Sequence, residues 1–108
     1  MTTFDERERA FETRYARDQE MQFKITARRN RLLGQWAAGL MGLTEAESDA
    51  YAKDVVRADF EEAGDEDVIR KLIGDLTSAG VETDEVKIRE ALEHKTVEAR
   101  RQLMESQG

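Results

Sequence analysis

The feature of this sequence that most constrains its fold is the recurrence of apolar residues at spacings of three and four, in a chain without any proline. Such spacing predicts amphipathic α-helices, and no stretch alternates apolar and polar residues long enough to predict a β-strand. With proline absent, the sparse glycines are expected to end the helices. A chain of 108 residues suffices for one domain with a modest core. We therefore expect a single all-α domain.

The apolar pattern divides the chain into five helical segments. They cover about 3–19, 20–41, 44–64 and 65–79, and a last segment that begins near residue 84. Two segments open with the spacing of a capping box, Thr3 with Glu6 and Thr44 with Glu47. Short connections between helices of this length favour antiparallel neighbours. We predict that residues 20–106 form a small antiparallel four-helix bundle and that residues 1–19 form a separate N-terminal arm.

The segment over residues 1–19 has no obvious place in that bundle. Its aromatic residues Phe4, Phe11 and Tyr15 are spaced so that they lie within about 40° of one another on a helix. The acidic and basic residues around this aromatic stripe stand at supportive spacings, but each ion pair contributes only about 0.2–0.5 kcal/mol. Because an isolated helix of this length is marginal in water, we expect a mobile, helix-forming arm.

Charge is distributed unevenly along the chain. Residues 1–20 have a net charge of −2, residues 21–43 have +4 with no acidic residue, and residues 44–108 have −9. The middle segment is therefore a basic island in an acidic protein. Two interpretations stay open: a helix face paired with acidic helices of the same molecule, or a surface for an acidic partner.

The basic island holds Lys24, Arg28, Arg29 and Arg31, with Asn30 between two of the arginines. Closely spaced arginines can contact phosphates, and an asparagine can read a base edge. However, the chain has a net charge of −7, which opposes association with nucleic acid. A carboxylate-rich protein surface is the better match, and no nucleic acid partner is expected.

The sequence offers little chemistry for catalysis. It contains no cysteine, which excludes disulfides, thiolate zinc sites and thiol catalysis, and no glycine-rich phosphate-binding motif. The single histidine, His94, has Glu90 and Glu98 four residues away on either side, but a histidine on a charged helix is usually a solvated one. We expect neither enzymatic activity nor a bound metal or cofactor.

The N-terminal residues also bear on localisation. The first twenty residues are strongly charged, unlike a signal peptide, and no 18-residue apolar run is present. We expect a soluble, cytoplasmic protein that does not insert into a membrane.

Three stretches of the N-terminal half resemble one known family. They are Thr2-Thr3-Phe4-Asp5-Glu6-Arg7-Glu8-Arg9-Ala10, then Phe23-Lys24 with Ala27-Arg28-Arg29-Asn30-Arg31-Leu32-Leu33-Gly34, and then Trp36-Ala37-Ala38-Gly39-Leu40. These stretches resemble the zeta subunit family, the alphaproteobacterial inhibitors of the rotary proton-translocating ATP synthase. The likeness is near-continuous over residues 1–43 and weakens to the segment 65–72 beyond them.

The resemblance implies an inhibitory subunit. In the family, a mobile arm of roughly the first eighteen residues enters an interface between catalytic and non-catalytic subunits of the synthase head, beside the central rotor. The arm becomes helical there and blocks ATP hydrolysis much more than synthesis. The expected partners are thus the catalytic head subunits and the central rotor stalk, at the cytoplasmic face of the membrane-bound synthase, and we expect a monomer when the protein is free.

The expected partner-binding residues come from the arm and from the basic island. They are Phe4, Asp5, Arg7, Glu8, Arg9, Phe11, Arg14, Tyr15, Lys24, Arg28, Arg29 and Arg31. Phe11 and Tyr15 stand where the family pattern tolerates His, Phe or Ala, which indicates contacts of adjustable strength. The alternative to an inhibitor is a helical adaptor that binds RNA or another acidic partner through residues 24–31.

Overall fold

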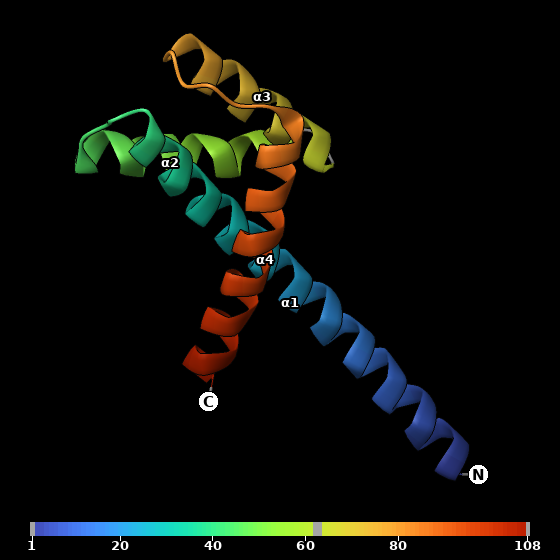
Figure 1. The fold of residues 1–108 in the computed structure, drawn as a ribbon. Coiled ribbons are helices and arrows are strands. Elements are labelled where there is room, and N and C mark those ends of the chain that lie inside the picture. The colour runs from blue at the N-terminus through green and yellow to red at the C-terminus, as the bar shows by residue number, and fades with distance from the viewer. Residues whose placement is uncertain (1, 62–63, 108) are drawn as a thin grey trace.

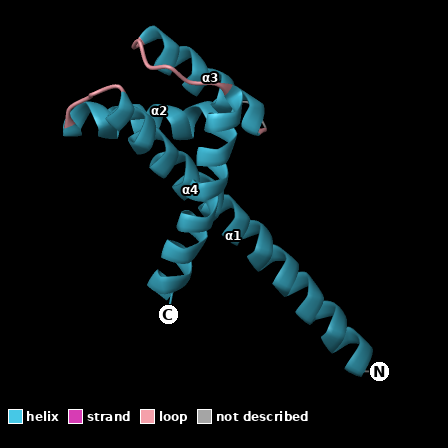
Figure 2. Ribbon diagram, viewed as in Figure 1, coloured by secondary structure: helices cyan, strands magenta, loops and turns pink. Residues whose placement is uncertain are grey.

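The computed structural model describes the backbone of residues 2–61 and 64–107, and the side chains of residues 18–59 and 64–106. Its elements are α1 (Thr2–Leu40), α2 (Glu45–Glu61), α3 (Asp65–Ser78) and α4 (Glu85–Gln107). Within the described ranges there is no β-strand (Figure 2). The prediction of an all-α fold with four packed helices is confirmed.

Helix α1 joins two of the predicted segments. Residues 3–19 and 20–41 were expected as separate helices, but α1 is one helix of 39 residues. No proline or glycine occurs in the chain before Gly34, so no helix-breaking residue ends the helix near residue 20. The first turns of α1 extend away from the other three helices (Figure 1). The radius of gyration is accordingly 17.4 Å, against about 13 Å for a compact chain of this length.

The core has two clusters, and α1 contributes to both. The main cluster joins all four helices through Leu33, Ala37, Val55, Val68, Ile69, Leu72, Leu76 and Ile88. The second lies between α1 and α4 and consists of Ile25, Ala99 and Leu103. Trp36 is partly buried against the main cluster. Burial on α1 begins at Ile25 among the described side chains, so this helix organises the body through its second half.

Glycines end two of the helices, as predicted. Gly42 follows α1 with a φ of 72°, and Gly80 follows α3 with a φ of 80°. After Gly80, the Val81 N–H donates to the Leu76 carbonyl at 2.9 Å, which completes a Schellman motif. Only glycine adopts this left-handed conformation at no steric cost, so the sequence sets these helix ends locally.

The starts of α2 and α4 are capped by side chains. Thr44 and Glu47 form the predicted capping box: the Glu47 N–H donates to Thr44 Oγ1 at 3.2 Å, and the Thr44 N–H donates to Glu47 Oε1 at 2.9 Å. The hydrogen bond from the Thr44 backbone lowers the pKa of Glu47 below its usual value. Asp84 caps α4 by accepting from the Lys87 N–H at 2.9 Å. The predicted box at Thr3 lies outside the described side chains.

Helices α1 and α2 lie close together at Gly34, where a Cβ atom would stand 2.7 Å from the Ala52 Cα. We expect Gly34→Ala to lower the free energy of unfolding by about 1–3 kcal/mol, because two backbones must separate. Gly74→Ala in α3 is the matched control, since nothing lies within 4 Å of its added Cβ. It should raise stability by about 0.5–1 kcal/mol. Urea denaturation measures both, and an unchanged Gly34→Ala variant would contradict the close approach.

Candidate protein-interaction site

The first turns of α1 carry eight of the expected partner-binding residues. They are Phe4, Asp5, Arg7, Glu8, Arg9, Phe11, Arg14 and Tyr15. Their backbone is helical, because α1 begins at Thr2. Their side chains lie outside the described ones, so the roles of these residues stay predictions. On one continuous helix, however, the spacings of the aromatic stripe keep its three members on the same face.

The structure separates one of the four basic residues of the island, Arg29, from the other three. Lys24 and Arg31 are exposed and Arg28 is partly buried. Arg29 is only 6% exposed. The island is therefore not one continuous surface, since one of its arginines points into the protein.

Arg29 is held by an acid and an amide. Its Nη2 donates to Asp65 Oδ1 at 2.9 Å and to Asn30 Oδ1 at 2.9 Å, and its Nε donates to the same Asn30 oxygen at 3.1 Å. Asn30 is itself 1% exposed, and Asp65 lies in the first turn of α3. Of the two interpretations of the basic island, Arg29 fits the pairing with an acidic helix of the same molecule. Its ion pair with Asp65 links α1 to the start of α3.

The other basic residues face a hollow of about 530 Å³ where α1, α2 and α4 meet. Its lining combines basic side chains with apolar ones and one serine: Phe23, Lys24, Ala27, Arg28, Arg31, Val56, Leu103 and Ser106. A second hollow of about 340 Å³, lined by Arg31, Asp49, Lys53 and Val56, adjoins it through two shared residues. We call the two together the basic groove.

One wall of the basic groove is braced across two helices. Arg28 Nη1 donates to Gln102 Oε1 of α4 at 3.0 Å. Lys24 and Arg31 are seven residues apart on α1 and so lie on one face of it. Neither of them forms an ion pair with any side chain that the structure describes. Both cations are therefore available at the rim.

Several groove residues were not predicted from the sequence. Phe23 stood among the residues of the family resemblance but was given no role, although it is 57% exposed. Val56 on α2 and Leu103 on α4 also line the groove. An aromatic residue next to a lysine was the available sequence signal for Phe23. Val56 and Leu103 carried no such signal, because the groove forms only when α2 and α4 pack on α1.

A polar network joins α2 to α3 on another part of the body. The Tyr51 hydroxyl donates to Asp75 Oδ2 at 2.7 Å, and Lys71 Nζ donates to the same oxygen at 3.0 Å. Lys71 Nζ also lies 5.1 Å from the centre of the Tyr51 ring. Burial, and then the Asp75 carboxylate, raise the pKa of Tyr51 above its usual value. Tyr51 therefore stays protonated and serves as a hydrogen-bond donor between two helices.

Two further observations concern metals and membranes. His94 is exposed on α4, and among the described residues no group of three or more acidic or histidine side chains is arranged to hold a metal ion. Within the same part of the chain, none of the helices combines the length and apolar character needed to span a bilayer.

Comparisons with known proteins give the family context. The family model described as ATPase inhibitor subunit zeta matches residues 1–102. A solution NMR structure is similar to this chain, with 48% sequence identity and a TM-score of 0.71, and the match covers 80% of this chain and 98% of the other. A search of curated proteins found no match. The family match thus extends the likeness seen over residues 1–43 to nearly the whole chain.

Proposed function

Since the chain belongs to the ATPase inhibitor subunit zeta family, we propose that it is an inhibitory subunit of ATP synthase that acts through its N-terminal arm. In this proposal, residues 1–19 enter an interface between catalytic and non-catalytic subunits of the head, beside the central rotor, and stop ATP hydrolysis. The body, residues 20–106, remains outside that interface. The protein then works at the cytoplasmic face of the membrane-bound synthase, with the head subunits and rotor stalk as partners, and has no catalytic role of its own.

The observation that carries this proposal is the extension of α1 beyond the body (Figure 1). A helix of residues 2–19 is about 27 Å long, enough to reach deep into an interface between subunits. Its sequence places the aromatic stripe on one face. Helices with one apolar face and no partner in their own fold are typical of segments that bind in a groove of another protein.

The energetics of such an arm favour aromatic anchors. Ordering a segment of this length on binding costs roughly 2–5 kcal/mol. Phenylalanine and tyrosine bury about 150–250 Å² each, so a stripe of three offsets that cost and leaves a surplus for affinity. The charged residues of the arm stand on either side of the stripe in the sequence. Exposed charges at the rim of an interface mainly change the rate of association.

The proposal is tested by adding the purified protein to the catalytic head of the cognate synthase and measuring ATP hydrolysis. We expect hydrolysis to fall in a saturable way as the protein is titrated. In membrane vesicles that carry the complete synthase, ATP synthesis should be affected much less than hydrolysis. Unchanged hydrolysis at a saturating concentration of the folded protein would contradict the proposal.

A further inference from the structure

We propose that the basic groove is a second contact with the synthase, and that it takes an acidic amphipathic helix of a partner subunit. This inference rests on the proposed function and adds to it, because it concerns the body of the protein rather than the arm. Four features of the groove carry it: its charge, its apolar lining, the spacing of its basic residues and its position on α1.

The charge of the groove is opposite to that of the chain. Among the described side chains, four basic residues line it, Lys24, Arg28, Arg31 and Lys53, against one acidic residue, Asp49, whereas the chain has a net charge of −7. On α3 and α4, four basic residues form ion pairs with acids of the same molecule, Arg70, Lys71, Arg89 and Lys95, whereas Lys87, Arg100 and Arg101 form none with a described side chain. Among the described side chains, Lys24 and Arg31 at the rim of the groove have no ion-pair partner, and this positive charge favours a carboxylate-bearing partner.

The apolar lining selects the class of that partner. Phe23, Ala27, Val56 and Leu103 lie between the basic residues, and the volume of about 530 Å³ falls in the usual range for binding pockets, roughly 300–1,000 Å³. A nucleic acid backbone presents phosphates but nothing apolar to fill this space. A protein segment that carries both apolar side chains and carboxylates can fill the apolar hollow and pair with the basic rim.

The spacing of the basic residues suits a helical partner. Lys24, Arg28 and Arg31 stand four and three residues apart on α1, so they form a row about 10 Å long on one face. Carboxylates three and four residues apart on an opposing helix form a row with the same spacing. A helix laid along the groove can therefore meet the row with its acids while its apolar side chains enter the hollow.

The position of the groove explains what a second contact adds. One helix, α1, carries both the arm and the main wall of the groove. When two contacts are joined in this way, binding of the first raises the effective concentration of the second. The groove then holds the body on the head and increases the chance that the arm enters its interface.

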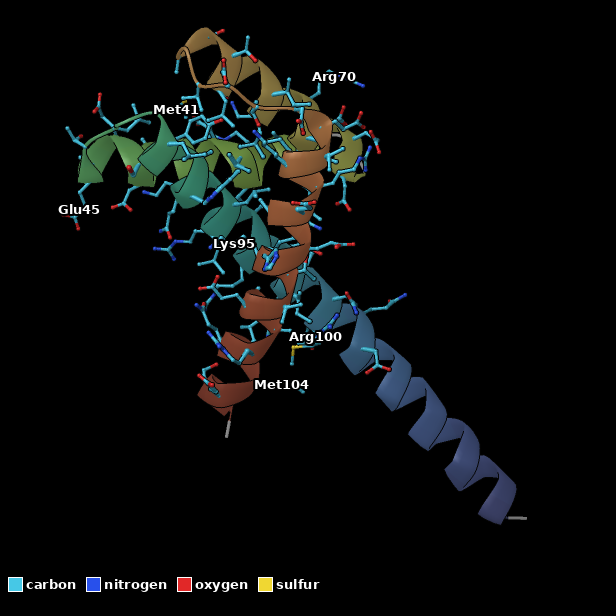
Figure 3. The ribbon with its side chains drawn as sticks, viewed as in Figure 1. Met41, Glu45, Arg70, Lys95, Arg100 and Met104 are labelled. Carbon is cyan, nitrogen blue, oxygen red and sulfur yellow. The ribbon has the colours of Figure 1, made fainter. Side chains whose placement is uncertain are left out.

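The test uses the full chain and two double variants. The groove variant, Lys24→Glu with Arg31→Glu, reverses the charge at the rim of the groove. The matched control, Arg70→Glu with Lys87→Glu, changes the net charge by the same amount elsewhere on the protein. Arg70 and Lys87 are both exposed and line neither hollow. Figure 3 shows Arg70 well away from Met104, which lies on α4 between the groove residues Leu103 and Ser106. Thermal melts establish that each variant is folded.

Binding to the purified catalytic head is measured for each variant, both alone and combined with Phe11→Ala, which weakens the arm. We expect the groove variant to bind at least tenfold more weakly and the control to stay within about twofold of the original chain, and the difference should shrink as salt is raised. If both double variants bind the head equally well, the inference is overturned while the proposed function stands, provided that the original chain still inhibits hydrolysis.

Two other outcomes also decide the matter. An original chain that neither binds the head nor inhibits it overturns the proposed function and, with it, this inference. Binding of a labelled single-stranded RNA is measured for the same chains. The inference is overturned in favour of a nucleic acid site if the RNA binds the original chain more tightly than the head does, and if the groove variant loses this binding while the control keeps it.

Discussion

Replacing Arg29 with alanine is expected to lower the free energy of unfolding by about 2–4 kcal/mol. The guanidinium is buried and makes the side-chain hydrogen bonds to both Asn30 and Asp65. Its removal leaves the Asn30 carbonyl oxygen without a donor among the described side chains, and a buried polar group without a partner costs about 1–3 kcal/mol. The loss of the Asp65 pair adds to this cost, reduced because the Asp65 side chain is 49% exposed.

The matched control is Arg31→Ala, two residues along the same helix. Arg31 is exposed and has no ion pair with a described side chain, so its replacement should change stability by less than about 0.5 kcal/mol. Arg29→Lys tests the geometry, because an ammonium group cannot reproduce the planar fork that reaches both partners. It should recover only part of the loss. Urea denaturation that finds Arg29→Ala as stable as Arg31→Ala would contradict an interior role for Arg29.

Phe11→Ala is expected to weaken inhibition of ATP hydrolysis at least tenfold, the equivalent of about 1.4 kcal/mol in binding. Phe11 is the middle member of the aromatic stripe, so its loss removes the central anchor of the proposed arm contact. The melting temperature should not change, because residues 1–19 are proposed to lie outside the core. An inhibition titration and a thermal melt of the same preparation measure the two effects together.

Arg7→Ala provides the contrast within the arm. A charge at the rim of an interface contributes mainly through long-range attraction, so its replacement should cause a milder loss that shrinks further at high salt. Titrations at two salt concentrations distinguish the two variants. Full inhibition by Phe11→Ala beside complete loss in Arg7→Ala at both concentrations would show that a buried ion pair, not the aromatic stripe, holds the arm.

The helices could be predicted from the sequence because their signals are local. Gly42, Gly80, Asp84 and the capping box at Thr44 all act within a few residues, and each behaves as its residue type predicts. The expected break near residue 20 was wrong for the opposite reason. It was inferred from the apolar pattern, and a change in that pattern does not end a helix when no glycine or proline accompanies it.

The interaction site could be predicted only in part. The basic island could be recognised in the sequence. However, the local sequence does not show which of its basic residues, Lys24, Arg28, Arg29 and Arg31, is buried. Only the packing of α3 on α1 buries one of them, since the partner Asp65 lies 36 residues further along the chain. The groove likewise depends on the meeting of three helices, which no local pattern reports.

One measurement tests most directly whether residues 1–19 inhibit the synthase. ATP hydrolysis by the cognate catalytic head is titrated with the full chain and with a variant that lacks residues 2–17. We expect the full chain to inhibit and the shortened chain to lose inhibition while it keeps its melting temperature, because the buried side chains of the described body begin at Ile25. A shortened chain that is folded and inhibits as strongly as the full chain would contradict the account.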